Sequence, residues 1–237
     1  MTMFLHEVHQ VRGAREDDFE SHYRDRWMAE LASGDDARLL WYLHQAHGTG
    51  PAYRIVTITA VRDGAAYERL VERVQLGDLR AWARDLDGMQ HSCEAKLLVQ
   101  VPWSPLADLD LAAVPVEPGA AHELSLYMED TGWPHAPLDD YTAYWERVYL
   151  PMLHGDGRSA PRLLQIEAVF QVAHGAGRRP EAILFQKVVS HDGLLRLLEH
   201  ETPPEMRKPG SFMHDALQVR DQWESRLLRT SAWSPRY

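Results

Sequence analysis

The sequence predicts an α+β protein that consists of two tandem βαββαβ units packed sheet to sheet. The first observation is an internal repeat, because Glu94-Ala95-Lys96-Leu97-Leu98 followed by Trp103-Ser104-Pro105 returns as Glu224-Ser225-Arg226-Leu227-Leu228 followed by Trp233-Ser234-Pro235. The second is that each copy shows strand and helix patterns in the same order. A duplicated unit therefore sets the architecture before any chemistry is considered.

The repeat extends over both halves of the chain. Asp17-Asp18 matches Asp139-Asp140, and Asp63-Gly64 matches Asp192-Gly193, so the offset between the copies grows from 122 to 129 residues. Small loop insertions explain this drift. Because solenoid repeats span roughly 20 to 50 residues, each copy is expected to be a domain or half of a closed assembly.

In the first copy, β-branched and aromatic runs mark strands, and apolar side chains at every fourth position mark helices. One such stripe is Phe19, Tyr23, Trp27 and Leu31, and the residues Gly48-Thr49-Gly50-Pro51 signal a hairpin. The expected elements are a strand over 4–12, a helix over 15–31, hairpin strands over 39–47 and 53–61, helices over 65–74 and 79–86, and a closing strand over 93–101.

The second copy gives the same order of elements. These are a strand over 123–129, a helix over 138–153, hairpin strands over 163–172 and 182–190, helices near 194–199 and 213–223, and a closing strand near 226–232. Proline and glycine mark residues 102–121 as an extended connector between the copies. We therefore divide the chain into a first unit over 1–106, a Pro-rich linker over 107–121 and a second unit over 122–237.

The order βαββαβ is that of the ferredoxin-like unit, a four-stranded antiparallel sheet with helices on one face only. The other face of each sheet needs a cover. A tandem copy supplies it, because two sheets packed face to face bury both apolar surfaces and protect their edge strands. We expect an intrachain version of the dimeric α+β barrel.

The ends of the units carry the residues of a known family. The end of each copy resembles the closing strand of NIPSNAP-like domains. In the first copy this segment is Glu94 with Lys96-Leu97-Leu98 and Pro102-Trp103-Ser104-Pro105, and the second copy has its counterparts. Glu7 and Glu123 are similar to the early glutamate of that family's opening strand. The resemblance implies a place in the dimeric α+β barrel superfamily, which includes cofactor-independent monooxygenases, polyketide cyclases, muconolactone-type isomerases and haem enzymes.

Composition limits the partners and the location of the protein. The formal net charge of −10 and the lack of a Lys/Arg-rich block argue against nucleic acid and anionic membrane surfaces. No basic N-terminal region precedes an apolar run, and no stretch approaches about 18 apolar residues. We expect a cytoplasmic protein that binds a small-molecule substrate, no nucleic acid and no membrane, and we leave a homodimer open.

The sequence gives weak signals for metals and cofactors. Cys93 is the only cysteine, which excludes an intrachain disulfide and a Cys-rich zinc site. Histidines three apart on an expected strand, such as His6 and His9, point to opposite faces, so we expect no metal. No Gly-x-Gly-x-x-Gly or Gly-x-Ser-x-Gly motif occurs. We expect no cofactor, with haem as the alternative that the resemblance implies, on one of His91, His154, His174, His191 and His214.

Aromatic side chains are more numerous than helix-on-sheet packing requires. Such side chains can simply fill the hydrophobic core. Tyrosine and tryptophan, however, also carry polar atoms that suit a pocket for a flat substrate. The expected substrate-binding residues are Trp27, Trp41, Trp82, Tyr127, Tyr144, Trp145 and Tyr149. The expected catalytic residues are the pair Tyr42 and His44, or the pair His6 and Glu7, with His22 as a further candidate. Because His6 and Glu7 are neighbours on a strand, they cannot both face inward.

These residues favour an enzyme that uses acid–base chemistry on a hydrophobic, aromatic or polyketide-like small molecule. The expected activity is that of a cofactor-independent cyclase, isomerase or monooxygenase in natural-product tailoring. A haem-dependent oxidoreductase or dehydratase and a non-catalytic binding or interaction protein are the alternatives. In the second copy Gln171 or a neighbour takes the place of His44, and His122 that of His6, so we expect one reactive pocket rather than two.

Overall fold

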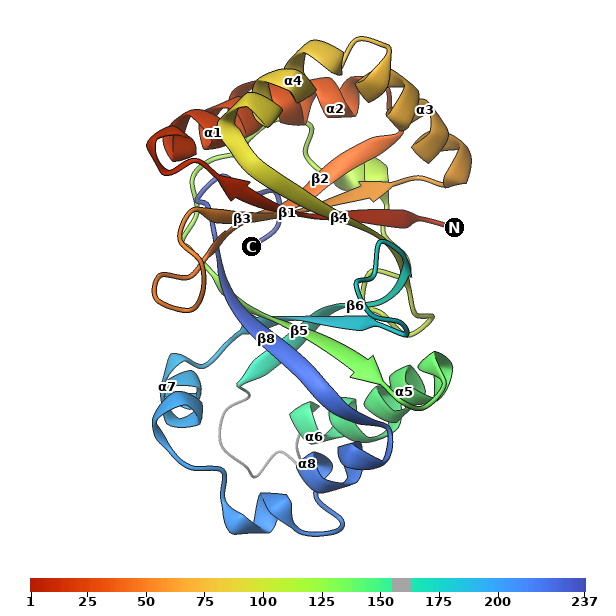
Figure 1. Cartoon of the computed structure of the whole chain (residues 1–237), viewed down its shortest axis with the longest axis vertical. Coiled ribbons are helices and arrows are strands. Elements are labelled where there is room, and N and C mark those ends of the chain that lie inside the picture. The colour runs from red at the N-terminus through yellow and green to blue at the C-terminus, as the bar shows by residue number, and fades with distance from the viewer. Residues whose placement is uncertain (155–162) are drawn as a thin grey trace.

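The computed structural model describes residues 1–154 and 163–237, without the side chain of His154 (Figure 1). In the first half, the strands are β1 (Met3–Val11), β2 (Ala37–Gln45), β3 (Arg54–Val61) and β4 (Gln90–Gln100). Its helices are α1 (Glu16–His22), α2 (Met28–Ser33), α3 (Gly64–Gln75) and α4 (Arg80–Met89), with a π-helical turn η2 (Tyr23–Trp27) between the first two. The helix predicted over 15–31 is thus one helical arm with a π turn at its centre.

The second half has the same plan. Its strands are β5 (Leu126–Pro134), β6 (Leu164–His174), β7 (Ala182–Val188) and β8 (Arg220–Thr230). Its helices are α5 (Leu138–Tyr144), α6 (Leu150–His154), α7 (His191–Glu199) and α8 (Phe212–Asp215), and the π-helical turn η4 (Trp145–Tyr149) lies 122 residues after η2. Among the described residues, no helix is long and apolar enough to cross a membrane.

The eight strands form one closed barrel in the order β1-β3-β2-β8-β5-β7-β6-β4. Each half contributes four antiparallel strands, and the two sheets join where β2 pairs with β8 and β4 pairs with β6. The helices lie outside the barrel, in two layers at opposite ends of the molecule (Figure 1). The predicted fold, two ferredoxin-like units packed sheet to sheet as an intrachain α+β barrel, is confirmed.

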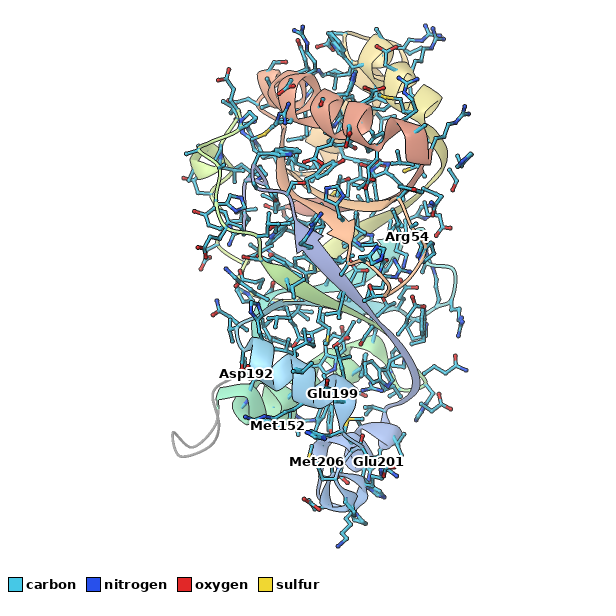
Figure 2. All side chains as sticks on the ribbon, turned by 90° about the vertical axis from the view of Figure 1, so that its left-hand side faces the viewer. Arg54, Met152, Asp192, Glu199, Glu201 and Met206 are labelled. Carbon is cyan, nitrogen blue, oxygen red and sulfur yellow. The ribbon has the colours of Figure 1, made fainter. Side chains whose placement is uncertain are left out.

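Alternation along the strands divides the core into an inner and an outer part. Phe4, Trp41, Tyr127, Phe170 and Phe185 fill the barrel between the two sheets. The outer face of the first sheet packs on its helices through a separate cluster, and that of the second sheet through two smaller ones. In Figure 2 the outer layer of the second half is marked by Met152 on α6 and by Asp192 and Glu199 on α7.

The repeated Trp-Ser-Pro segments are straps that cross from one half to the other. Trp103 packs in the helix layer of the second half, and Trp233 packs in that of the first. The Ser104 hydroxyl accepts a hydrogen bond from the Val169 amide at 3.1 Å, and Ser234 accepts one from the Tyr42 amide at 3.1 Å. The most recognisable part of the repeat therefore joins the halves.

Two predicted elements of the second unit are wrong. The opening strand is Leu126–Pro134 instead of 123–129, because the preceding residues run beside the end of β8, where the His122 amide donates to the Ala232 carbonyl. The helix expected over 213–223 is the four-residue α8, and Trp223 already lies on β8. Apolar residues at helical spacing there belong to a short helix followed by a strand.

The correct strand bounds also change the correspondence between the copies. His6 pairs with Lys96 in the register of β1 and β4, and Glu129 pairs with Arg226 in that of β5 and β8. Because Lys96 and Arg226 match in the repeat, His6 corresponds to Glu129 and not to His122. By the same register Glu7 corresponds to Asp130 and not to Glu123.

Candidate functional site

His44 lies near the end of β2, on the outer face of the first sheet, where Tyr42 shares its face because the two residues are two apart on the strand. Helix α1 passes above this face. Glu16 and Glu20 are four residues apart on α1, so both carboxylates point to the same side of the helix. The fold thus brings His44 between two glutamates that are distant from it in sequence.

The imidazole of His44 has hydrogen-bond partners at both nitrogens. Nδ1 lies 3.2 Å from Glu16 Oε1, and Nε2 lies 3.1 Å from Glu20 Oε2 and 2.9 Å from the Ser231 hydroxyl. A carboxylate only accepts hydrogen bonds, so the protonated ring, with an N–H on each side, satisfies both glutamates at once. The His44 ring is thus held between the two carboxylates.

Glu20 is held more firmly than Glu16. Burial works to raise the pKa of Glu20, but hydrogen bonds from His44, Ser231 and Trp233 outweigh it and lower the pKa to about 2. The Trp233 indole donates to Glu20 at 2.7 Å. The side chain of Glu16 is 32% exposed, against 24% for Glu20, and has His44 as its partner in this cluster. Glu20 is thus a fixed carboxylate and Glu16 a displaceable one.

A hollow of about 290 Å³ opens over this cluster. Its walls come from both halves, since α1 and β2 meet β8 and the strap that follows it. The lining residues are mostly polar: Glu16, Asp17, Glu20, His44, Leu124, Arg229, Thr230, Ser231 and Ala232. A small molecule in this hollow would contact the imidazole edge directly.

The ring of Tyr42 packs against the ring of His44, and Tyr42 does not line the hollow. The two rings meet edge to face at a centroid distance of 5.5 Å. The Tyr42 hydroxyl is buried and has no hydrogen-bond partner among the described residues. Burial, together with the charges of Glu20 and Glu16, raises the pKa of Tyr42 well above its usual value. Tyr42 therefore stays neutral.

The second half has a counterpart of this site that lacks the imidazole and both glutamates. By the register of the hairpin strands, Gln171 takes the place of His44. By the repeat offset, Leu138 and Thr142 replace Glu16 and Glu20, and Val101 replaces Ser231. Gln171 donates to Asp139 at 3.0 Å and to Thr142 at 3.4 Å. The second half thus forms the same fold without the imidazole and the two glutamates.

A second polar cluster lies on the same outer face, toward β1. His9 is buried, with Nδ1 2.9 Å from Gln90 Oε1 and Nε2 3.2 Å from the Thr57 hydroxyl. The ligand atoms of Glu7, His9 and Cys93 all lie within 4.8 Å of one another. Glu7, expected as a catalytic residue, thus joins His9 instead of His6, as the alternation of a strand requires.

The other expected catalytic residues lie apart from His44. His6 points into the barrel, where Nε2 is 2.7 Å from Glu129 Oε2. His22 lines an open, charged groove of about 630 Å³ between α1 and α4, where burial lowers its pKa and its Nε2 has no partner among the described residues. Tyr42 and His44 are the one expected pair that the fold brings together.

The expected substrate-binding aromatics do not meet in one place. Trp41 and Tyr127 lie inside the barrel, and Trp27 and Trp82 lie in the helix layer of the first half. Tyr144, Trp145 and Tyr149 lie in that of the second half. None of these residues lines the hollow over His44. Their role in substrate binding stays a prediction.

Sequence reasoning missed Glu16, Glu20, Ser231 and Asp130. The first two carried a signal, since two glutamates at a spacing of four share a helix face. Ser231 belongs to the strap of the second copy, and only the closed barrel brings it to His44. Asp130, on the outer face of the second sheet, has a pKa raised to about 6 because burial outweighs its hydrogen bonds from Ser225 and Gln186.

The described histidines proposed as haem ligands do not fit that role. His91, His174 and His191 are exposed, and His214 is bonded to Asp215 at 3.0 Å. None of the four lines the hollow over His44 or the groove beside His22. The side chain of His154 lies outside the described part of the chain.

Comparison with known proteins supports the fold. No protein-family profile matches the sequence, and no curated protein matches it. An anthrone oxidase-like protein aligns over 98% of this chain and 93% of its own, at 10% identity and a TM-score of 0.57. A candidate monooxygenase from Lactobacillus acidophilus NCFM aligns over 98% and 96%, at 6% identity and a TM-score of 0.55.

Proteins of the NIPSNAP family are also among the matching structures. The one from Agrobacterium tumefaciens str. C58 covers 45% of this chain and 99% of its own, at 15% identity and a TM-score of 0.38. The full-length matches agree with the closed barrel described above, so the chain has the fold of the dimeric α+β barrel in a single polypeptide.

Proposed function

We propose that this protein is an enzyme that moves a proton to or from a small substrate bound over His44, without a cofactor. The observation that carries the proposal is the cluster itself: an imidazole held between two carboxylates and a hydroxyl, at the edge of a hollow. The counterpart in the second half lacks the imidazole and both glutamates, which supports a functional origin for them.

Glu20 and His44 form the working pair. Glu20 stays ionised because its pKa is about 2, and it keeps the Nε2–H of His44 pointed at itself. This leaves Nδ1 as the nitrogen that exchanges protons. When a substrate takes the place of Glu16, the Nδ1 proton leaves with the Glu16 carboxyl group, and His44 becomes neutral. Nδ1 then takes the substrate's proton, and the imidazolium returns it at another position.

The hollow suits a molecule of about one ring. Its volume of about 290 Å³ lies just below the roughly 300–1,000 Å³ typical of ligand sites. Leu124 and Ala232 offer apolar contact, and Arg229 offers a cation for an enolate or phenolate oxygen. Cyclisation, isomerisation and cofactor-independent oxygenation of aromatic substrates all begin with removal of such a proton, so the proposal covers these three activities.

The proposal can be tested with a panel of small phenols and aryl ketones. Binding is followed by saturation-transfer NMR, and catalysis by deuterium incorporation next to the ketone carbonyl in D₂O. We expect His44→Gln to slow the exchange by about 10²–10⁴-fold, the usual contribution of general acid–base catalysis. His47→Gln, on an exposed residue just beyond β2, is the matched control.

The NMR experiment measures binding, and the deuterium incorporation measures catalysis. Because Gln171 occupies the equivalent position in the second half, His44→Gln is expected to keep the fold, which circular dichroism verifies. Equal exchange rates in the wild type and His44→Gln, or a panel with no member that binds, would contradict the proposal.

A further inference from the structure

Three side chains of different metal-binding types meet on the outer face of the first sheet. Glu7 and His9 are two apart on β1 and so point to the same side. Cys93 on β4 lies directly opposite His9 in the register of the two strands. Their ligand atoms lie within 4.8 Å of one another, and the Cys93 sulfur is 4.0 Å from Glu7 Oε1.

The imidazole of His9 is oriented by its neighbours. Gln90 donates from Nε2 to Asp87 at 2.9 Å, which leaves Gln90 Oε1 to accept from His9 Nδ1–H at 2.9 Å. The lone pair of His9 is therefore on Nε2, where the hydroxyls of Tyr23 and Thr57 lie at 3.3 and 3.2 Å. A ring N–H fixed in this way is the usual outer support of a metal-binding histidine.

An ion can reach the cluster from solvent. Cys93 is exposed on a part of β4 that does not pair with β6, which leaves a path for an ion from solvent.

Of these ligand types, the second half has only the carboxylate at the equivalent positions. By strand register, Asp130 takes the place of Glu7, Gly132 that of His9 and Trp223 that of Cys93. A sheet of the same fold therefore forms without the imidazole and the thiol, so the fold does not require them in the first half.

We propose that Glu7, His9 and Cys93 form a binding site for a divalent transition metal, with Zn²⁺ as the best fit. Thiolate, imidazole and carboxylate together are the ligands of zinc, and three protein ligands leave the fourth tetrahedral position open to water or another ligand. Binding replaces the Cys93 S–H bond with a metal–sulfur bond and releases one proton to the buffer. This site is separate from the one over His44.

The test uses the full chain and Zn²⁺ alone. Isothermal titration of the reduced protein at pH 7, in two buffers of different ionisation enthalpy, gives both the affinity and the number of protons released. We expect one Zn²⁺ and close to one proton per chain. Titration with Co²⁺ is expected to show the charge-transfer band of a cobalt thiolate.

Variants assign the ligands. Cys93→Ser is expected to abolish the proton release and the cobalt thiolate band, and His9→Gln to abolish binding. Gln90→Ala leaves the ligands in place and is expected to weaken binding by about 10–100-fold, because it frees the His9 ring. Glu94→Gln, next to Cys93 but on the opposite face of β4, is the matched control and is expected to bind as the wild type does.

Two results would overturn the proposal. One is a wild-type protein that retains no Zn²⁺ after gel filtration. The other is a Cys93→Ser variant that binds Zn²⁺ with unchanged affinity and unchanged proton release. Circular dichroism of each variant checks the fold, and if His9→Gln does not fold, Cys93→Ser and Gln90→Ala decide the question on their own.

Discussion

His6 and Glu129 occupy equivalent positions in the two repeats and contact each other inside the barrel, with His6 Nε2 2.7 Å from Glu129 Oε2. Both side chains are 1% exposed. Arg226 lies 3.6 Å from the other carboxylate oxygen of Glu129. The duplicated unit has thus placed a base in one copy and an acid in the other, and the pair joins the halves through the barrel interior.

The first prediction concerns Glu129. Burial works to raise its pKa, but the charges of His6, Arg226 and Lys96 and the hydrogen bond from His6 lower the pKa to about 2. A lowered folded-state pKa stabilises the protein above the unfolded value near 4.5, and this contribution is lost as the pH falls toward 2. We expect Glu129→Gln to lower the free energy of unfolding at pH 7 by roughly 3 kcal/mol, as for other broken buried pairs.

Urea denaturation at several pH values measures this effect. The difference between wild type and Glu129→Gln is expected to shrink between pH 5 and pH 2. Glu224→Gln, on an exposed residue of β8, is the control and should change stability little at any pH. A constant difference over this range would argue against an ionised Glu129 in the folded state.

The second prediction concerns the next residue, Asp130, whose pKa is raised to about 6 mainly by burial. Because the folded state binds this proton more tightly than the unfolded state, stability falls as the pH rises from about 4 to above 6. We expect Asp130→Asn to stabilise the protein by about 1–2 kcal/mol at pH 7.5 and to have no such effect at pH 4. Thermal unfolding of both proteins at the two pH values tests the sign.

The opposite shifts of these neighbours explain what sequence could and could not predict here. Glu129 faces the barrel with His6, whereas Asp130 faces the helix layer beside Gln186. Alternation on a strand predicts that the two point to opposite faces, but not what each one meets. The cross-barrel partner depends on how the two sheets dock.

The fold itself was predictable because the repeat is carried by residues that build it. The matched Trp-Ser-Pro segments hold the halves together, and the βαββαβ order follows from local apolar patterns. The opening strand of the second unit was misplaced by about three residues, since the segment before it is extended without being part of the sheet. That error also hid the equivalence of His6 and Glu129.

The candidate site was predictable only in part. Tyr42 and His44 share a face by strand alternation, which sequence shows directly. Glu20 and Ser231 reach His44 through helix packing and through a strap from the other repeat, 24 and 187 residues away in sequence. Contacts of this kind carry no local pattern, so they require the folded chain.

The third prediction replaces the charged cluster with its counterpart from the second half. The quadruple variant Glu16→Leu, Glu20→Thr, His44→Gln and Ser231→Val is expected to fold, because the equivalent residues already pack in the same fold. We expect a melting temperature no more than a few degrees below that of the wild type and no detectable proton exchange with the aryl ketone panel. A variant that does not fold would show that the cluster serves stability instead of chemistry.

The fourth prediction tests whether the two straps are equivalent. Ser104 and Ser234 are 3% and 2% exposed, and each hydroxyl accepts from a buried amide of the other half at 3.1 Å. Removing either hydroxyl leaves that amide without its partner, which costs about 1–3 kcal/mol. We expect Ser104→Ala and Ser234→Ala to lower the free energy of unfolding by similar amounts, measured by urea denaturation. Ser92→Ala, on the exposed part of β4, is the control and is expected to change it little.

Because Ser234 lies beside the His44 cluster and Ser104 does not, only Ser234→Ala is expected to weaken ligand binding as well. Equal loss of binding in both variants would mean that the straps act on the barrel as a whole.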